Sequence, residues 1–353
     1  MIKLPGLIDT HVHLREPGAA QKEDFETGTK AAIAGGYTTI LDMPNNPEPT
    51  VTLNTLEKKI TLTKSRIYCD LGFHFGATLD SVAYFPKVKD KVFGLKVYMN
   101  HTTGGLLQEN PQVLKKIFEA WLNDRVIMVH AEGPSLEKAI SLSKQFNSKL
   151  HVCHVSLAEE IRLIKQAKDQ RLSITCEVSG HHLFLTDEDL GRLEGFGKMR
   201  PPLPSKKDQK ALWEAIADGT IDTIASDHAP HTKEEKSSNN PPNGVPGLET
   251  TLPLLLTAVS EGRLIIDDII RLCHTNPKRI FNIPDQPDTY VEVDPTIRYT
   301  LYAIRLYTKC SWTPFEGMKV IGKIKRVVLR GNLVYDNGQV SDPPKGQVIY
   351  PKK

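Results

Sequence analysis

The chain of 353 residues lacks the features that mark secreted, membrane-bound or nucleic-acid-binding proteins. Its five cysteines are scattered and odd in number, which argues against a disulfide framework. No apolar run approaches the about 20 residues of a membrane-spanning helix, and no signal-peptide pattern is visible at the N-terminus. The net charge is only +3, with acidic and basic residues interspersed, so no basic tract points to nucleic acid or an anionic membrane. We therefore expect a cytoplasmic protein with neither nucleic acid nor membrane as a partner.

Strand-like and helix-like segments alternate along most of the chain. Eight strand candidates cover residues 6–13, 37–45, 70–77, 94–100, 126–132, 150–156, 173–178 and 221–227. Helical patterns cover residues 22–34, 111–122, 134–145, 158–168 and 207–217, and a weaker one covers 80–91. This alternation predicts an α/β fold with a parallel sheet, and eight units favour closure into a (β/α)8 TIM barrel. An open doubly wound sheet is disfavoured because no glycine-rich phosphate loop follows the first strand.

The remainder of the chain predicts additions to the barrel. Residues 247–260 and 265–274 have helical patterns, and 284–309 is irregular. Residues 322–340 look like short antiparallel strands with a turn at 336–338. We expect residues 1–284 to form the barrel with extra helices. Residues 285–353 are expected to form an irregular segment and a small C-terminal β appendage.

The first strand candidate ends in a histidine pair. His11 and His13 are two residues apart, so both imidazoles point to the same side of a strand. Two converging neutral imidazoles are what a divalent transition metal requires. The alternative is one buried and one solvated histidine on an edge strand.

Other reactive residues also fall at strand ends, where active sites of such barrels lie. Asn45, His130, His154, Glu177 and Asp227 end their strands, Lys96 lies within the fourth strand, and His228 and His231 follow Asp227. Lys96 has two readings. Beside two cations its neutral amine is favoured, and that amine can add carbon dioxide to form a carbamate able to bridge two metals. Alternatively, its ammonium pairs with Asp227.

Several motifs carry a resemblance to a known family. They are Asp9-Thr-His-Val-His-Leu-Arg-Glu-Pro-Gly18, Met43-Pro-Asn45, Gly94-Leu-Lys-Val-Tyr98, Val129-His-Ala-Glu132, His151-Val-Cys-His-Val155, Thr175-Cys-Glu-Val178 and Ala225-Ser-Asp-His-Ala-Pro-His231. The sequence resembles the amidohydrolase superfamily, and within it the dihydroorotases, closest in pattern to the dihydroorotase domain of the multifunctional animal pyrimidine-synthesis protein. The resemblance runs nearly from end to end, although residues 295–309 match poorly. It implies a distorted barrel of the metal-dependent amidohydrolase type.

The resemblance also implies a metal centre with two Zn²⁺ ions. His11, His13 and Asp227 are expected to hold one zinc, and His130 and His154 the second. Lys96, carboxylated, is expected to bridge the two zincs together with a hydroxide. Cys153 and Glu177 match positions credited with a third zinc in animal relatives. A buried cysteine and a carboxylate that orients a ligand explain these two residues equally well.

Substrate contacts follow from the same resemblance. Arg15, Asn45 and His231 are expected to bind a substrate carboxylate, and Arg200 to add a further contact. Backbone around Ala229 and Gly244 is expected to face the ring, and Thr102 lies where the family has a mobile loop.

The expected activity is the reversible cyclisation of N-carbamoyl-L-aspartate to L-dihydroorotate in pyrimidine biosynthesis, with a metal-bridging hydroxide as nucleophile and Asp227 as general base and acid. Two alternatives remain. One is ring opening of substrates without a carboxylate, as by allantoinases, hydantoinases and dihydropyrimidinases. The other is a non-catalytic homologue. Relatives suggest a homodimer and aspartate carbamoyltransferase as a partner.

Overall fold

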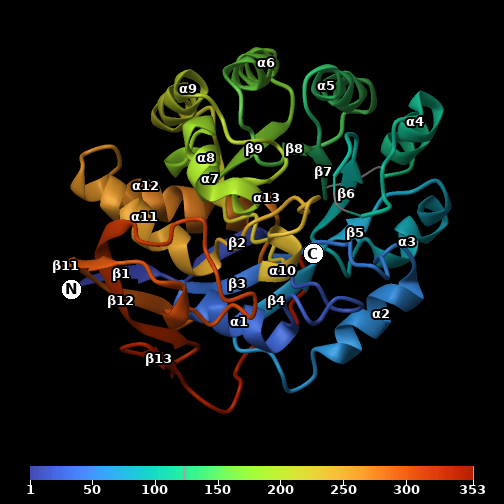
Figure 1. Ribbon diagram of the computed structural model, residues 1–353. Helices are drawn as coiled ribbons and strands as arrows, with labels where there is room; N and C mark the ends of the chain where they lie inside the picture. Colours follow the sequence, from blue (N-terminus) through green and yellow to red (C-terminus); the bar gives the residue numbers. More distant parts are fainter. Residues whose placement is uncertain (103, 122–124, 353) are drawn as a thin grey trace.

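The computed structural model describes residues 1–102, 104–121 and 125–352. A barrel of eight parallel strands, here called staves, forms its centre (Figure 1). The staves are β2 (Leu7–Val12), β3 (Tyr37–Asp42), β4 (Asp70–Phe73) continued by β5 (Phe75–Gly76), β6 (Gly94–Tyr98), β7 (Val126–His130), β8 (Leu150–Val152), β9 (Ile174–Ser179) and β10 (Thr223–Ala225). Two ladders run in the order β2-β3-β4 and β5-β6-β7-β8-β9-β10, and every pair is parallel. The ring closes where the amide of His13 donates to the carbonyl of His228 at 2.8 Å. All eight predicted strands are present. Seven are shorter than predicted, and β9 has the predicted length but begins and ends one residue later.

Helices surround the barrel and connect the staves (Figure 1). They are α1 (Phe25–Ala34), α2 (Leu53–Leu62), α3 (Phe85–Val88), α4 (Pro111–Ala120), α5 (Pro134–Phe146), α6 (Ala158–Asp169) and α9 (Lys206–Ala217). Their starts follow from local chemistry, since Asp24, Asn110 and Ser205 each accept a backbone N–H of the first turn. The predicted helix 111–122 is confirmed to Ala120, while residue 122 lies outside the described residues.

Two connections differ from the sequence prediction. Helix α2 was not predicted, although Leu53, Leu56 and Ile60 recur at helical spacing in its sequence; the side chain of Thr52 caps it by accepting the amide of Thr55. The weak helix predicted over 80–91 is a 3₁₀ turn, Asp80–Tyr84, followed by the single turn of α3.

Further helices complete the fold. They are α7 (Gly180–Phe184), α8 (Leu190–Leu193), α10 (Lys233–Lys236), α11 (Leu248–Ser260), α12 (Ile266–Ile270) and α13 (Asn276–Ile280), with 3₁₀ turns at Asp187–Asp189, Glu194–Gly197 and Ala303–Arg305. The predicted helix 247–260 is confirmed as α11. The predicted helix 265–274 is α12 continued by a π-helical turn, Arg271–Thr275. No helix among the described residues is long and apolar enough to cross a membrane.

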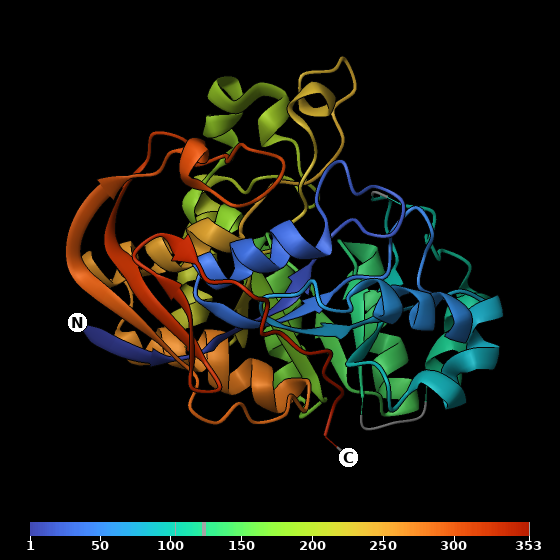
Figure 2. The same cartoon turned by 90° about the horizontal axis from the view of Figure 1, so that it is seen from below.

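An antiparallel sheet stands beside the barrel (Figure 2). Its order is β1 (Ile2–Pro5), β11 (Tyr290–Thr300), β12 (Lys319–Leu329), β13 (Asn332–Asp336) and β14 (Gln339–Val340). The predicted appendage and its turn are confirmed, with Asn337 and Gly338 at φ of 48° and 105° as such a hairpin turn requires. The division of the chain at residue 284 stays a prediction, and β1 adds N-terminal residues to this sheet.

The expectation of an irregular segment over 284–309 is wrong for its central part. Strand β11 is eleven residues long and pairs with both β1 and β12. Its pattern is hard to read in the sequence because Pro295 interrupts it. The register with β12 shifts between Asp294 and Arg298, so the alternation of buried valines, Val291 and Val293, does not continue past that point.

Candidate active site

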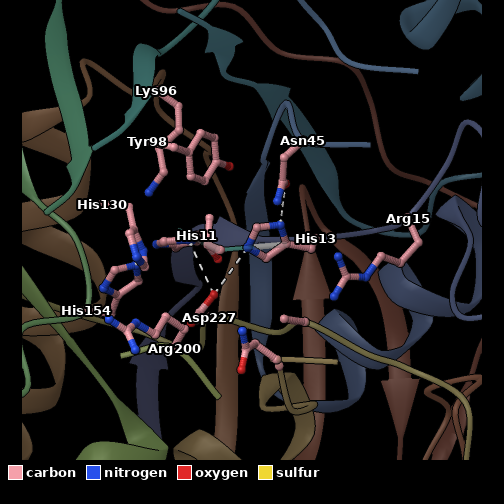
Figure 3. Close-up of a pocket in the computed structure, with 14 residues that line it drawn as sticks. His11, His13, Arg15, Asn45, Lys96, Tyr98, His130, His154, Arg200 and Asp227 are labelled. Atoms are coloured by element: carbon pink, nitrogen blue, oxygen red, sulfur yellow. Dashed lines mark hydrogen bonds and ion pairs between the residues drawn. The ribbon is translucent and has the colours of Figure 1, made fainter. Parts of the chain in front are cut away.

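Side chains from most of the barrel staves meet in one pocket at the carboxyl ends of the strands (Figure 3). The lining residues are His11, His13, Arg15, Asn45, Lys96, Tyr98, Thr102, His130, His154, Arg200, Asp227, Ala229, Asn243 and Gly244. The structure therefore brings together every predicted site residue except three. Cys153 and Glu177 lie beneath the pocket, and His231 lies behind Arg15.

The first group of potential metal ligands comprises His11, His13 and Asp227. The Nε2 atoms of the two histidines lie 3.4 and 3.3 Å from the same oxygen, Oδ1 of Asp227. One ligand atom from each of the three residues falls within 4.8 Å of the others. Two nitrogens and a carboxylate oxygen around one point fit a divalent transition metal.

Contacts from other parts of the chain fix which nitrogen each histidine presents. Oδ1 of Asn45 accepts from Nδ1 of His13 at 2.8 Å, and Glu177 accepts from Nδ1 of His11. In both rings the Nδ1 proton is therefore held by an acceptor, and Nε2 is left to face the cation site. Such outer contacts orient metal-binding imidazoles and set their tautomer.

The second group is His130 and His154. Nδ1 of His130 and Nε2 of His154 lie only 2.8 Å apart, so both rings point at one spot. On its other side, Nε2 of His130 lies 3.3 Å from the carboxylate of Glu132. Among the described residues, the buried Nδ1 of His154 has no hydrogen-bond partner. The arrangement fits a second cation whose arrival would separate the two nitrogens.

Lys96 lies between the two groups and is fully buried. Its Nζ is 2.9 Å from Sγ of Cys153 and 5.1 Å from the centre of the Tyr98 ring. Within the described part of the chain it forms no ion pair, so the pairing with Asp227 that the sequence allowed is not observed. The buried amine of Lys96 lines the same pocket as both groups of potential metal ligands.

Cys153 and Glu177 form a third group together with His11. One ligand atom from each lies within 4.8 Å of the others, and all three residues are buried. Glu177 also accepts from Nε2 of His151 at 3.1 Å and from the hydroxyl of Thr10 at 3.4 Å. The geometry thus allows both a further metal and a carboxylate that orients His11.

Burial keeps most of these imidazoles neutral, which is their metal-binding form. Burial lowers the pKa of His13 to about 3 and also lowers the pKa of His130 and His154. His11 differs: burial lowers its pKa, but the carboxylates of Glu177 and Asp227 together outweigh burial and raise its pKa to about 10. The pKa of Asp227 lies well below its usual value because His11 and His13 outweigh the effect of burial.

The opposite wall of the pocket carries Arg15, which is buried although charged. Its Nε donates to the carbonyl of Pro230 at 2.9 Å, which fixes the plane of the guanidinium. Behind it, Nε2 of His231 lies 2.9 Å from the carbonyl of Asn243, and Nδ1 lies 3.2 Å from Nζ of Lys22. The ammonium of Lys22 can only donate, so Nδ1 of His231 accepts. The carbonyl of Asn243 can only accept, so Nε2 of His231 carries the proton. It has no lone pair for Nη2 of Arg15, 3.1 Å away.

The remaining predicted substrate contacts also border the pocket. Arg200 is exposed, and its Nε donates to Glu132 at 2.8 Å. Gly244 has a φ of 129°, and a Cβ there would lie 2.6 Å from the carbonyl of Ala229. Only glycine therefore allows these two backbone segments to approach so closely. Thr102 lines the pocket from the loop that follows β6.

Sequence reasoning missed two lining residues, Tyr98 and Asn243. Tyr98 lies two positions after Lys96 on the same strand, so strand periodicity would have placed both on one side. Its buried hydroxyl has no hydrogen-bond partner among the described residues. Asn243 directly precedes Gly244, and no signal in the sequence distinguished it from the rest of its loop.

Three site residues have left-handed backbone conformations. The φ angles of Arg15, His154 and Asp227 are 62°, 37° and 46°. Such conformations cost about 1–3 kcal/mol each in residues other than glycine and persist only where the surroundings enforce them. The rest of the barrel therefore offsets this conformational cost and directs these side chains into the pocket.

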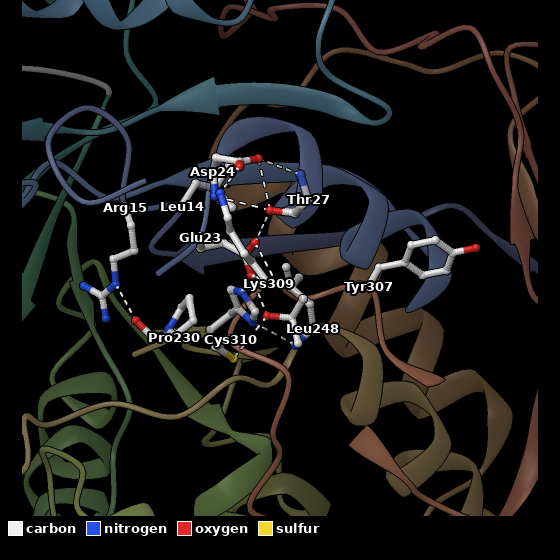
Figure 4. Close-up of polar contacts among 12 residues, drawn as sticks. Leu14, Arg15, Glu23, Asp24, Thr27, Pro230, Leu248, Tyr307, Lys309 and Cys310 are labelled. Atoms are coloured by element: carbon white, nitrogen blue, oxygen red, sulfur yellow. Dashed lines mark hydrogen bonds and ion pairs between the residues drawn. The ribbon is translucent and has the colours of Figure 1, made fainter. Parts of the chain in front are cut away.

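A buried carboxylate, Glu23, ties the loops around the site together (Figure 4). It accepts the amide of Lys309 and the hydroxyl of Thr308, from the segment that follows β11. It also accepts from Nε2 of His228 at 3.3 Å, whose carbonyl closes the barrel. One side chain thus links the C-terminal segment to the residue next to Asp227.

The comparisons with known proteins agree with this site. A profile of the Amidohydrolase family matches residues 2–287. The "Multifunctional protein CAD" of Squalus acanthias is 47% identical over 98% of this chain, which spans only 15% of the length of that relative. The "Dihydroorotase" of Pyrococcus furiosus is 36% identical over 99% of this chain and 85% of its own length.

Solved structures show the same architecture. The L-hydantoinase (dihydropyrimidinase) of Arthrobacter aurescens superposes with a TM-score of 0.94 at 27% identity, covering 99% of this chain and 89% of its own. The inactive dihydroorotase-like domain of the Chaetomium thermophilum CAD-like multifunctional protein has a TM-score of 0.84 at 28% identity and 99% coverage of both chains. The family is generally metal-dependent, and the clustered ligand groups agree with that. The chain belongs to the amidohydrolase family and, within it, groups with the dihydroorotases.

Proposed function

We propose that this chain interconverts N-carbamoyl-L-aspartate and L-dihydroorotate as a metal-dependent cyclic amide hydrolase of pyrimidine biosynthesis. The observation that carries the proposal is the buried Arg15 opposite the two metal-binding groups. A guanidinium binds a carboxylate through two parallel hydrogen bonds. Dihydroorotate has a carboxylate on a ring carbon, whereas hydantoins and dihydropyrimidines lack it and leave this arginine unpaired. The names of the relatives point to the same reaction.

In this proposal His11, His13 and Asp227 hold one Zn²⁺, and His130 and His154 hold the second. Lys96, carboxylated by carbon dioxide with release of a proton, would supply an anionic ligand shared by the two cations. When bound, the two cations supply a hydroxide near neutral pH and polarise the ring carbonyl.

Asp227 moves the proton in the hydrolytic direction. It accepts the proton of the attacking hydroxide and delivers it to the ring nitrogen as the amide bond breaks. Its low pKa makes it a weak base, so it holds the proton only between the two transfers. Ring closure is the reverse and consumes one proton, because a carboxylate becomes a neutral amide carbonyl. Closure is therefore favoured at low pH and opening at high pH.

Arg15, Asn45 and Arg200 bind the substrate in this proposal, and His231 acts from behind Arg15. Because Nε of Arg15 is occupied by Pro230, its two terminal nitrogens are the donors for the carboxylate. Backbone around Ala229 and Gly244 lines the side of the pocket where the ring would lie. Thr102 would contact substrate from its loop.

Cys153 and Glu177 are proposed to hold a third zinc together with His11. Support comes from the clustering of one thiol, one carboxylate and one imidazole nitrogen. In that case Nδ1 of His11 would be deprotonated and Glu177 would be a ligand instead of an acceptor for the ring N–H.

Two specific observations favour other functions and must be tested. The high TM-score with the L-hydantoinase would fit ring opening without a substrate carboxylate. The likeness to an inactive dihydroorotase-like domain would fit a non-catalytic role. Against the second, all six residues of the two proposed metal sites are present and converge in this chain.

We further propose a homodimer and an association with aspartate carbamoyltransferase. The supporting observation is that two relatives are named as multifunctional proteins, and this chain spans only 15% of the length of each.

The experiment is an ultraviolet assay of dihydroorotate hydrolysis beside hydantoin, allantoin and dihydrouracil, with metal content measured on the same preparation. We expect turnover of dihydroorotate and at least two zinc ions per chain. Turnover of hydantoin or allantoin without dihydroorotate would establish the first alternative. Less than one metal per chain with no turnover would establish the second.

A further inference from the structure

Lys236, the last residue of α10, is a buried cation with no carboxylate partner among the described residues. The residue is 1% exposed. Its Nζ donates to three backbone carbonyls, those of Lys198 at 2.8 Å, Pro242 at 2.9 Å and Gly244 at 3.0 Å. It also lies 5.6 Å from the ring centre of Trp312. Within the described ranges no acid lies within ion-pair distance of it, so the carbonyls alone hold the charge.

The three carbonyls belong to the two segments that build one wall of the pocket. Pro242 and Gly244 flank Asn243, and Lys198 stands two residues before Arg200; Asn243, Gly244 and Arg200 line the pocket. The amide of Gly244 also donates to the carbonyl of Lys198 at 3.1 Å. On the pocket side, Nε2 of His231 donates to the carbonyl of Asn243. The ammonium therefore joins both segments from outside, while His231 holds one of them from inside.

We propose that Lys236 is a positioning residue whose ammonium orders the pocket wall formed by residues 198–200 and 242–244, and that the wall loosens when Lys236 gives up a proton. The proposal rests on the proposed function for its kinetic readout, because substrate must contact this wall. It acts through backbone and does not place Lys236 in contact with substrate.

The charges around Lys236 determine the direction of the pH effect. Burial, assisted by the nearby charges of Lys198 and Arg15, lowers its pKa to about 7. His231, the other titratable group that faces it, is kept neutral by burial and by Arg15, which lower its pKa. The ammonium has three N–H donors for three carbonyls, but the neutral amine has only two. The wall is therefore fully held below about pH 7 and loses one hydrogen bond above it.

The test compares Lys236→Met with the control Lys233→Met in the metal-loaded enzyme. Lys233 begins the same short helix but is exposed. At about pH 6 we expect Lys236→Met to raise KM for dihydroorotate about tenfold, as for the loss of about one charge-assisted hydrogen bond, with kcat changed less than about twofold. In the control and the wild type KM should rise severalfold between about pH 6 and 8.5, and in Lys236→Met it should not.

Hydrogen exchange of residues 238–247 supplies a readout that does not need turnover. We expect faster exchange in Lys236→Met than in Lys233→Met at the same low pH, and a smaller difference at high pH. A raised KM with unchanged exchange would mean that the charge only attracts the substrate, and it overturns positioning. Equal pH profiles of KM in both variants overturn it too.

A third variant keeps the test decisive if Lys236→Met fails to fold. Lys236→Gln has two N–H donors, like the neutral amine, and should show the high-pH KM of the wild type at every pH. If the wild type itself turns over no dihydroorotate, the proposed function fails, while the exchange data still decide the role of Lys236.

Discussion

Replacement of Arg15 by methionine tests the substrate assignment most directly. Nε of Arg15 is committed to Pro230, so two terminal nitrogens remain for the substrate carboxylate. Hydrogen bonds to charged groups contribute about 1.5–3 kcal/mol each, and two of them lost give about 4 kcal/mol, or roughly a thousandfold in kcat/KM for dihydroorotate. Lysine retains the charge but not the planar fork, so Arg15→Lys should recover only part of this loss.

Dihydrouracil is the matched substrate, because it is dihydroorotate without the carboxylate. The same substitution should leave its slow turnover unchanged or slightly improved, since the wild type leaves Arg15 unpaired with it. Arg66→Met is the matched variant: Arg66 pairs at 2.9 Å with Glu16, next to Arg15, but does not line the pocket. Equal losses on both substrates in Arg15→Met, with Arg66→Met unaffected, would refute the carboxylate assignment and indicate general damage to the site.

The remaining predictions concern the metal centre and the pH dependence of stability. Lys96→Ala should lower kcat at least about a thousandfold together with metal content, as expected when a bridging ligand is lost; normal activity in this variant, measured beside Lys233→Ala, would exclude the carbamate. X-ray absorption spectra at the zinc edge should show a sulfur ligand at about 2.3 Å from zinc, and this signal should disappear in Cys153→Ser. If the wild type lacks the sulfur signal, Cys153 is a buried thiol and not a ligand. Burial raises the pKa of Glu249 to about 8, although it accepts the amides of Tyr307 and Thr308. The folded protein thus keeps a proton that the unfolded chain loses near pH 4.5, and stability should fall from about pH 5 to 8 by at most about 1.4 kcal/mol per pH unit for this group. Glu249→Gln should reduce that slope in thermal melts, and an unchanged slope would show that Glu249 is ionised in the folded state.

Most of the barrel and most of the pocket could be predicted from local patterns. Apolar runs bounded by turn residues place the staves, and the parallel order of such a barrel puts their carboxyl ends at one mouth. Residues as distant as His11, His130 and Asp227 could therefore be assigned to one site without knowing any contact between them. The elements that were missed are α2, whose apolar residues Leu53, Leu56 and Ile60 make only a short helical pattern, and β11, which Pro295 interrupts.

The sequence by itself determined the order of elements and the chemical groups available at the mouth of the barrel. Only the tertiary structure decided how those groups are presented. Glu177 on β9 and Asn45 in the segment after β3 select the nitrogen that His11 and His13 turn to the metal site. His231 was brought behind Arg15, and Lys236 against three carbonyls, by loops that carry no periodic signal. The physical reason is that strand and helix periodicity is local, whereas a hydrogen bond between residues far apart in the chain exists only once the barrel has closed.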